Sequence, residues 1–599
     1  MNTIKQIIDK AKTESVGDYF WLFKEIEKMD KDAMKKVKIA LLSSFTTKGI
    51  KEVLTVECLK NGIFPEVYLG GYNNYAQEIL NEDSSLYNFN PDLVIIFVDI
   101  QALFMDAYFL MPGFSEEKRK ELISEQFKKM KSLIETLSER TSAKILLHNF
   151  AVPTYSPLGI LENKQNFGFI ESIKWLNKRL EELSEKLKVF IFDYELFCSK
   201  IGKNNLFDSR MYYLADMKID LKYLPDLVDE YLAYIKPLLF LTRKCLVLDL
   251  DNTLWGGIVG EDGFENIKLG PTPEGRSFLE FQYYISGLSD SGVILAINSN
   301  NNLEDAMRVI NEHPDMFLKE KRFASIKINW NDKVSNMKEI ARELNIGLDS
   351  MVFIDDNQAN REIIKQALPE VLVVDLPNDS AFYVKTLIEI NDFNTLEITE
   401  EDKKRGETYS TQRQREEFKK KATNITEYLK NLETVVKIEK INDFIIPRIA
   451  QLTQKTNQFN ATTRRYFVDD INNFLKSGRY SIIATNVKDK FGDNGTTGLV
   501  IIEKLPESWR IDTFLLSCRV IGRAIEKIML AHIIEKAKGA GTKKLVGEFI
   551  ATAKNTPAKD FYRDNGFKLT EEKEGFQKWE FNLENSEPQY PEFIKIIEN

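Results

Sequence analysis

The chain has 599 residues, of which 43% are hydrophobic, and it carries a formal net charge of −9. Its length predicts about three or four domains, and the acidic balance argues against a broad nucleic-acid interface. No uninterrupted apolar run approaches the ~20 residues that span a bilayer, so no membrane span is expected.

The cysteines are few and scattered. Cys58, Cys198, Cys245 and Cys518 form no CxxC pair, which suits a reducing compartment and argues against structural zinc. Residues 1–12 are polar and charged and lack the apolar core of a signal peptide. We therefore expect a cytoplasmic protein.

The first part of the chain predicts an α/β unit. Residues 1–36 predict charged helices, and residues 37–240 alternate short apolar strands with helical stretches. Such alternation predicts a parallel sheet with helices on both faces. The expected strands are 38–42, 92–98, 143–147 and 189–192.

Residues 37–240 resemble the SGNH/GDSL hydrolase fold, a flavodoxin-type α/β arrangement. Ser43 or Ser44 follows the first strand, where that fold places its nucleophile. The Asp-x-x-His pattern of the fold is not met, because Met211 stands three positions after Asp208. His148 ends a different strand and is expected to be structural. A serine hydroxyl without a base is a weak nucleophile, so we predict no hydrolase activity and favour a docking or lid role.

Residues 241–385 predict a second α/β unit, with strands expected at 245–248, 293–297, 351–354 and 371–374. Asp249 and Asp251 stand at the end of its first strand. Residues two positions apart share one side if the strand persists that far. One carboxylate can then attack phosphorus and form an aspartyl-phosphate, while the other handles the proton.

Further residues fit the same site. Ser299 can donate to a phosphoryl oxygen, and Lys333 could neutralise charge on the phosphate and the nucleophile. Asp355 and Asp356 follow a strand, where two adjacent acids are a poor structural choice unless a cation offsets them. Mg²⁺ prefers such hard oxygen ligands, and open α/β sheets place their sites beyond strand ends. The alternative is that these acids only cap helices.

This order of motifs resembles the haloacid dehalogenase (HAD) superfamily. The resemblance implies that Asp249 is the nucleophile and Asp251 the general acid and base. It also implies that Ser299 and Lys333 hold the phosphoryl group. The Mg²⁺ ligands that it implies are Asp249, the backbone carbonyl of Asp251, Asp355 and Asp356.

The spacing of these motifs predicts an open, capless site. About 45 residues separate Thr253 from Ser299, and about 33 separate Ser299 from Lys333. Neither interval has room for a lid domain. Water must then be excluded by a large substrate or a neighbouring domain, and a carrier protein is the natural candidate.

The last part of the chain predicts a charged helical linker over 386–430 and a mixed α+β unit over 431–590. In that unit, Arg519, Gly522 and Ala524 resemble the pyrophosphate loop of GNAT acyltransferases, and Asn555 and Tyr562 fall in a segment like the usual GNAT ending. Backbone N–H groups at a helix N-terminus bind phosphate oxygens. The resemblance implies that these five residues bind CoA or a carrier-bound phosphopantetheine. The alternative is a glycine-permitted turn before an amphipathic helix.

A dense polar cluster over 454–460 precedes the pair Arg464 and Arg465. These groups could bind an acyl chain or a phosphopantetheine arm. The alternative is a hydrogen-bonded loop followed by a solvated basic pair.

The whole arrangement resembles the FkbH-like proteins of HAD subfamily IIIC. The segments that carry the resemblance are 248–257, 328–330, 353–357, 454–460 and 517–520. Such proteins dephosphorylate a phosphorylated three-carbon acid of the bisphosphoglycerate kind and load its glyceryl group onto an acyl carrier protein. The resemblance therefore implies Mg²⁺ as cofactor and the carrier as partner.

One position departs from the family. Family members often have a Cys before the serine of the second motif, where a thioester could form, whereas this chain has Asn298 before Ser299. If an enzyme-bound acyl group is required, Cys518 is the best remaining thiol, because a position before a helix N-terminus would lower its pKa. Simple packing of Cys518 beside its loop is the favoured reading. Acyl transfer is otherwise direct, or the substrate differs.

Two other functions stay open. The runner-up is a HAD phosphatase fused to a CoA-dependent N-acyltransferase in surface polysaccharide or sugar modification, which Asn298 slightly favours. The third is a docking scaffold for a carrier protein with a degenerate site, against which the intact Asp249, Asp251, Lys333 and Asp355 weigh.

Overall fold

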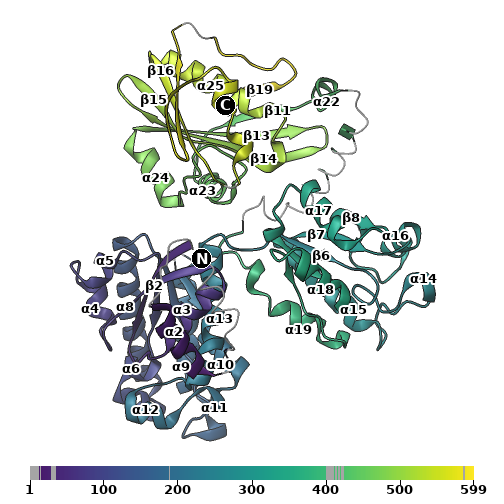
Figure 1. The fold of residues 1–599 in the computed structure, drawn as a ribbon. Helices are drawn as coiled ribbons and strands as arrows, with labels where there is room; N and C mark the ends of the chain where they lie inside the picture. Colours follow the sequence, from purple (N-terminus) through teal and green to yellow (C-terminus); the bar gives the residue numbers. More distant parts are fainter. Residues whose placement is uncertain are drawn as a thin grey trace. The chain divides into compact units, whose positions relative to one another are not determined.

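The computed structural model describes most of the chain as two compact units, Met1–Leu239 and Phe240–Asn599 (Figure 1). The described residues are 13, 15–27, 35–185, 187, 189–398, 411, 415, 418–419, 424–552, 554–584 and 587–598. Residues 1–12 and most of the linker stretch 400–421 lie outside them. The finer division of the chain at 36, 385 and 430 stays a prediction.

The first unit contains a five-stranded parallel sheet in the order β2-β1-β3-β4-β5. Helices α8 (Glu116–Arg140) and α9 (Phe169–Ser184) share one apolar core with strands β1, β3 and β4. The strands are β1 Lys35–Ser43, β2 Ile63–Leu69, β3 Leu93–Phe97, β4 Lys144–His148 and β5 Val189–Phe192. The predicted α/β class is confirmed here.

The second unit begins with another five-stranded parallel sheet, ordered β10-β9-β6-β7-β8. Its central strand β6 is buried on both faces, since Leu246 and Leu248 belong to one core and Cys245 and Val247 to another. Parallel strands covered by helices on both sides read as continuous apolar runs for this reason. The strands are β6 Cys245–Leu248, β7 Ile294–Ser299, β8 Phe323–Ile328, β9 Met351–Ile354 and β10 Leu372–Val373.

The intervals between the phosphoryl-transfer motifs are short in space as well. Residues 253–299, all described, contain only the helices α14 (Val259–Asp262) and α15 (Arg276–Asp290) before β7. Residues 299–333, also all described, contain α16 (Leu303–Glu312), a 3₁₀ turn and β8. Neither interval forms a separate lid.

A mixed sheet completes the second unit, in the order β17-β18-β16-β15-β14-β13-β11-β19, with β12 paired to β15. The helix α25 (Ile525–Gly539) belongs to the same part of the unit. The strands are β11 Val435–Glu439, β12 Phe459–Asn460, β13 Tyr480–Asp489, β14 Gly492–Lys504, β15 Ser508–Leu516, β16 Lys544–Ile550, β17 Lys568–Lys573, β18 Phe576–Asn582 and β19 Lys595–Glu598.

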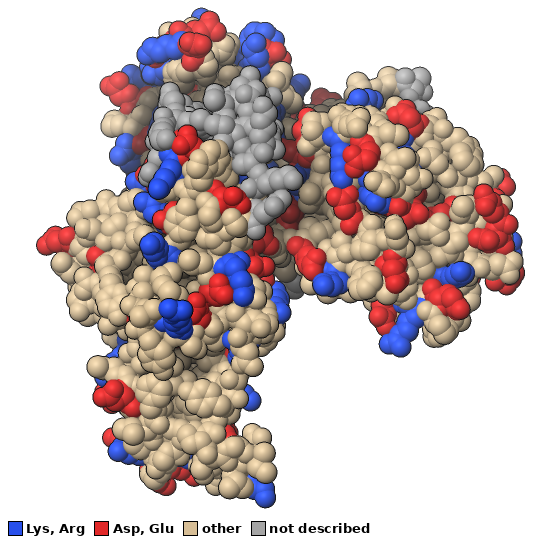
Figure 2. All heavy atoms as spheres, turned by 60° about the horizontal axis from the view of Figure 1, so that its bottom comes forward, with Lys and Arg blue, Asp and Glu red and all other residues tan. Residues whose placement is uncertain are grey.

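Two surface features bear on function. Among the described helices, none is long and apolar enough to cross a membrane. On the described part of the face drawn in Figure 2, Lys and Arg side chains are interspersed with Asp and Glu rather than gathered in one patch. One residue of the stretch predicted as a charged helical linker, Arg415, is fully buried, and its guanidinium pairs with Asp489 at 2.8 Å.

Candidate active site

The loop that follows β6 carries Asp249 and Asp251. The backbone N–H of Asp249 donates to the carbonyl of Ile354, which holds the loop to the end of β9. The carboxylate of Asp251 accepts hydrogen bonds from the indole Nε1 of Trp255 at 2.9 Å and from the backbone N–H of Val259 at 3.1 Å. Trp255 is fully buried, so this donor is fixed by packing.

Asn252 and Gly257 allow the loop after β6 to fold back on itself. Asn252 has a φ of +53° and Gly257 a φ of +96°, conformations that Asn and Gly adopt most easily. The Asn252 side chain accepts from the N–H of Gly257 at 2.8 Å. The hydroxyl of Tyr383 donates to the backbone carbonyl of Asn252 at 3.0 Å. In the motif Asp-Asn-Thr-Leu-Trp-Gly-Gly, Asp251, Asn252, Trp255 and Gly257 therefore each contribute to the shape of the turn.

Strand β7 supplies the next part of the site. Ser299 is its last residue and is buried, and its carbonyl accepts from the N–H of Asn329. Two residues later, the amide of Asn301 donates to Asp251 Oδ2 at 2.8 Å. The carboxylate of Asp251 thus accepts three hydrogen bonds. Burial is the largest effect on it and raises the pKa of Asp251, while these hydrogen bonds act in the opposite direction.

Lys333 is the first residue of α17 (Lys333–Glu343) and points its buried ammonium between two carboxylates. Its Nζ lies 2.9 Å from Asp249 Oδ2 and also pairs with Asp355 Oδ2. Burial lowers the pKa of Lys333, but the two negative charges outweigh this, so the pKa is raised and the lysine stays charged.

Asp355 and Asp356 follow β9 and complete the cluster. Asp355 is fully buried, and its side chain accepts from the N–H of Asn357 at 2.8 Å. Arg361 donates to the backbone carbonyls of both aspartates. Burial, reinforced by the neighbouring charge of Asp249, raises the pKa of Asp355 and raises the pKa of Asp356 to about 6.

The cluster fits a magnesium ion. Carboxylate oxygens of Asp249, Asp355 and Asp356 lie within 4.8 Å of one another. Asp249 Oδ1 is buried and has no hydrogen-bond partner. Lys333 pairs with two of these three carboxylates, so negative charge remains on oxygen ligands of the kind that Mg²⁺ prefers. The side chain of Asp251 lies outside this group, since its oxygens are engaged by Trp255, Val259 and Asn301.

Asparagines whose contacts the sequence did not predict anchor this site. Asn298 is buried, and its amide donates to the backbone carbonyl of Lys333 at 3.0 Å. The amide of Asn336 donates to Asn298 Oδ1 at 3.1 Å and to Asn329 Oδ1 at 3.1 Å. Asn298, which stands where the family often has a cysteine, therefore holds the first turn of α17 in place.

The hydrolase-like residues of the first unit do not form a triad. Ser43 Oγ accepts from the N–H of Phe45, and Ser44 Oγ accepts from the N–H of Asp99. His148 is buried with its Nε2 3.0 Å from the hydroxyl of Tyr231, and burial lowers its pKa. Asp208 caps a short helix through the N–H groups that follow it.

The loop before α25 carries Cys518, Arg519, Gly522 and Ala524. Cys518 begins a single 3₁₀ turn, Cys518–Val520, and is partly exposed. It lies seven positions before the first residue of α25, so it does not stand directly at that helix N-terminus. Gly522 and Ala524 both have positive φ, at +78° and +61°, and Arg519 Nε donates to Ser517 Oγ.

Asn555 and Tyr562, predicted to bind pantetheine, lie in the protein interior. Asn555 is 1% exposed, and its amide donates to the carbonyls of Asn460 and Ile550. Tyr562 is 0% exposed, and its ring packs against Gly547. The amide of Asn555 is thus engaged by the chain itself, and a role of either residue in binding CoA or pantetheine stays a prediction.

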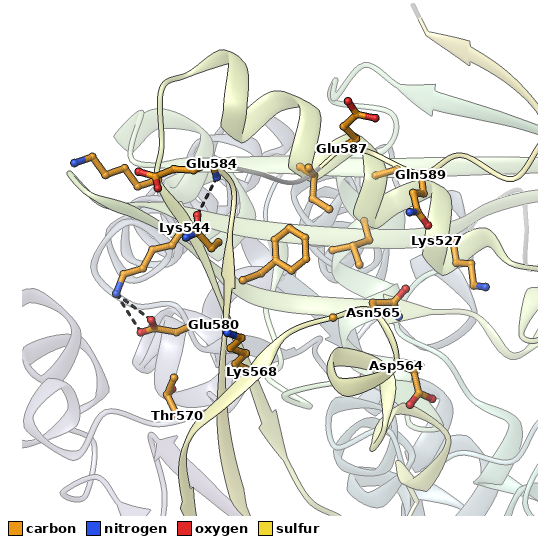
Figure 3. Close-up of a pocket in the computed structure, with 17 residues that line it drawn as sticks. Lys527, Lys544, Asp564, Asn565, Lys568, Thr570, Glu580, Glu584, Glu587 and Gln589 are labelled. Atoms are coloured by element: carbon orange, nitrogen blue, oxygen red, sulfur yellow. Dashed lines mark hydrogen bonds and ion pairs between the residues drawn. The ribbon is translucent and has the colours of Figure 1, made fainter.

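A separate hollow of about 970 Å³ lies beside α25, β16 and β18 (Figure 3). Lysines and acids alternate around it, and Lys544 pairs with Glu580 at 3.2 Å. The lining contains none of the predicted site residues, so it adds nothing to the phosphoryl-transfer cluster.

Comparisons with known proteins place the chain. A protein-family model described as "FkbH, N-terminal domain" matches residues 38–236. No curated protein matches the chain. Among solved structures, the N-terminal part of the protein BF1531 from Bacteroides fragilis, which contains a phosphatase domain and is complexed with Mg, is 31% identical, with a TM-score of 0.58. The match covers 63% of this chain and 99% of that one.

Solved structures of acetyltransferases match about a quarter of the chain. The ribosomal-protein-S18-alanine N-acetyltransferase from Escherichia coli is 13% identical over 25% of this chain and 98% of that one, with a TM-score of 0.20. The PaiA N-acetyltransferase from Thermoplasma acidophilum, in complex with coenzyme A, is 12% identical over 24% and 98%, with a TM-score of 0.19. On the evidence of the match to BF1531 and the FkbH model, the chain belongs to the FkbH-like proteins of the haloacid dehalogenase type.

Proposed function

We propose that the chain is a Mg²⁺-dependent phosphatase that works through Asp249. One observation carries this proposal: Asp249 Oδ1 is buried without a partner while Oδ2 is held by Lys333 at 2.9 Å. A carboxylate fixed at one oxygen and free at the other is poised to attack. The BF1531 relative, which contains a phosphatase domain complexed with Mg, supports the same assignment.

The residues around Asp249 divide the remaining work. Asp249 attacks phosphorus, the ester oxygen leaves with a proton from Asp251, and an aspartyl-phosphate forms. Water then attacks that phosphorus, Asp251 takes its proton, and Asp249 and inorganic phosphate are released. Ser299 and Lys333 hold the phosphoryl oxygens. The raised pKa of Asp251 suits a group that must both give and take a proton.

Asp249, Asp355, Asp356 and the backbone carbonyl of Asp251 would hold the Mg²⁺. Bound there, the ion would supply charge neutralisation for the phosphoryl group and the attacking carboxylate. Lys333 alone cannot do this, because it faces Asp249 and Asp355 together.

We extend the proposal to acyl transfer, as the family resemblance implies. The substrate would be a bisphosphoglycerate-like acid and the acceptor the phosphopantetheine thiol of an acyl carrier protein. Asn298 replaces the family cysteine next to Ser299, and the cysteine of β6, Cys245, is fully buried at the end of that strand away from Asp249. In a direct transfer, the thiol of the carrier would attack the acyl carbon and the phosphate on that carbon would leave, while Asp249 would remove the remaining phosphate ester.

The phosphatase proposal is tested with a chromogenic phosphate monoester and Mg²⁺. We expect phosphate release that EDTA abolishes and that Asp249→Asn lowers by several orders of magnitude. Phosphate release that survives Asp249→Asn unchanged would reject Asp249 as the nucleophile and favour the scaffold reading.

The loading proposal needs a separate experiment. The protein is incubated with bisphosphoglycerate, Mg²⁺ and a phosphopantetheinylated carrier, and the intact mass of the carrier is measured. A glyceryl adduct is expected. An active phosphatase that never modifies the carrier would keep the first proposal and reject the second.

A further inference from the structure

The gap between β15 and β16 is the place in the C-terminal sheet where an extended ligand could enter. These parallel strands pair only between Ser508–Ile511 and Lys544–Gly547. Beyond this point β15 continues to Leu516 and β16 to Ile550 without pairing to each other. Two separating strands expose backbone N–H and C=O groups that need partners, because buried polar backbone is rarely left unsatisfied.

The chain itself fills this gap with residues 459–464, here called the inserted segment. Phe459 and Asn460 pair antiparallel with Leu516 and Leu515 of β15. The N–H of Ala461 donates to the carbonyl of Phe514 at 3.0 Å, which extends the pairing along β15. On the other side, the N–H of Ile550 donates to the carbonyl of Ala461 at 2.8 Å. The inserted segment therefore joins both strands.

Side chains reinforce the insertion. Asn555 uses both ends of its amide: Nδ2 donates to the carbonyls of Asn460 and Ile550, and Oδ1 accepts from the N–H of Thr552. The hydroxyl of Thr462 donates to the carbonyl of Asp512 at 2.8 Å. These hydrogen bonds lie in the interior, where Asn460, Thr462 and Asn555 are at most 2% exposed.

The far end of the inserted segment is locked by charge. Arg464 donates to Asp512 at 2.6 Å and to Glu548 at 2.7 Å, so one guanidinium ties β15 to β16. The residue before it, Thr463, has a φ of +52°. Such a φ is strained for a β-branched residue and persists only where the surroundings enforce it. Here Asn460 Oδ1 accepts from the N–H of Thr463 at 2.9 Å and holds that turn.

We propose that the inserted segment occupies the gap between β15 and β16 in the working protein and takes the place that the arm of CoA or phosphopantetheine would need there. Phe459 and Asn460, the last two residues of the polar cluster 454–460, then form an internal strand rather than bind a ligand. Asn555 and Arg464 stabilise the closed gap. This inference does not rest on the phosphatase proposal, and it disfavours a CoA-dependent N-acyltransferase built on this gap.

The experiment is hydrogen–deuterium exchange of the full chain, without and with 1 mM CoA. We expect slow exchange of the amides of the inserted segment that CoA does not change. CoA that binds elsewhere and leaves this exchange slow is consistent with a filled gap. Saturable CoA binding that speeds exchange in the inserted segment would show displacement and overturn the proposal.

A variant tests whether the described contacts hold the segment. Thr462→Val keeps the shape and removes one buried hydrogen bond, so exchange over 459–464 should rise by about tenfold. Thr542→Val, on a partly exposed turn outside the gap, is the matched control and should leave that exchange unchanged. Equal exchange in wild type and Thr462→Val would contradict the insertion. Far-UV circular dichroism of both variants shows whether the fold is kept.

Discussion

The indole of Trp255 connects a buried side chain to the chemistry of Asp251. Its Nε1 is one of three donors to the Asp251 carboxylate, and hydrogen bonds to the ionised form lower the pKa of an acid. Removing that donor leaves burial, the largest effect on Asp251, less opposed. A residue that packs in the core thereby tunes an acid in the site.

We expect Trp255→Phe to lower kcat by about tenfold, or ~1.4 kcal/mol, within the range for a hydrogen bond to a charged group. The pKa of Asp251 should rise further, so the limb of the pH–rate profile that reports it should move to higher pH. The measurement is kcat against pH with a chromogenic ester. Trp175→Phe, a half-buried indole of the first unit, is the control. An unchanged kcat and profile in Trp255→Phe would contradict the role.

His148 makes the first unit sensitive to acid. It is stacked on Phe97 and Phe192, with ring centroids 3.8 Å and 4.3 Å away, and burial lowers its pKa well below 6.5. Below pH 6.5 the unfolded chain takes up a proton that the folded chain does not. Its contribution to stability is therefore fully present above about pH 6.5 and is lost as the pH falls toward the folded pKa.

We expect the free energy of unfolding of the first unit to fall by up to ~1.4 kcal/mol per pH unit below pH 6.5 because of this group. His148→Phe should flatten that slope by one proton, although Tyr231 loses its partner and the variant starts less stable at pH 7.5. Urea unfolding at several pH values measures both. Parallel slopes for wild type and variant would show that His148 does not titrate as described.

Helix α17 shows how an element carries a catalytic group. Its first residue is Lys333. Buried hydrogen bonds of Asn298, to the carbonyl of Lys333 and from the amide of Asn336, hold the first turn of the helix in place. The position of the lysine is thus set by a strand, a helix and the amides between them. A change in Asn298 should act on both stability and catalysis.

Asn298→Leu is expected to lower the free energy of unfolding of the second unit by about 2 kcal/mol, because it removes the buried hydrogen bonds of the Asn298 side chain with the carbonyl of Lys333 and the amide of Asn336. The kcat should fall as well, since the lysine shifts. Asn302→Ala removes only the cap of α16 and should cost about 1 kcal/mol with kcat kept. Equal losses of kcat in both variants would argue against a specific role for Asn298.

The surroundings of a strand decide whether its sequence predicts it. Strands β6, β7 and β9 are central and covered on both faces, so they are continuous apolar runs and are predicted almost to the residue. Strand β2 lies at a sheet edge, where Pro65 is tolerated, and its residues alternate in burial. It has no continuous apolar run, so the sequence does not predict it. Strand β12 is two residues inside a polar cluster, and only its partner β15 makes it a strand.

In the site, too, some features can be predicted from the sequence and others cannot. The acidic pair Asp355 and Asp356 can be predicted because its residue types are improbable at a strand end without a cation. The contacts of Asn298, Asn301 and Asn336 cannot, since an asparagine in a sequence does not say which backbone or side chain it will face. Charged residues of the site can be recognised in the sequence. The uncharged residues that position them can be recognised only in the structure.

At the scale of the whole molecule, the chain has two compact units with separate apolar cores. The predicted magnesium ligands all belong to the second. A ligand that binds only the folded state stabilises what it binds, by about 2.7 kcal/mol at one hundred times its Kd. Mg²⁺ should therefore act on one unit alone.

Calorimetry with and without Mg²⁺ tests this. At pH 7.5 we expect the ion to raise the Tm of the second unit and to leave that of the first unchanged. The pKa of Asp356 is raised to about 6, so its carboxyl is protonated below that pH and the shift should shrink at pH 5. Asp355→Asn should abolish the shift, while Glu312→Gln, an exposed acid on α16, should keep it. A Mg²⁺ shift that is equal in Asp355→Asn and wild type would place the ion elsewhere in the chain.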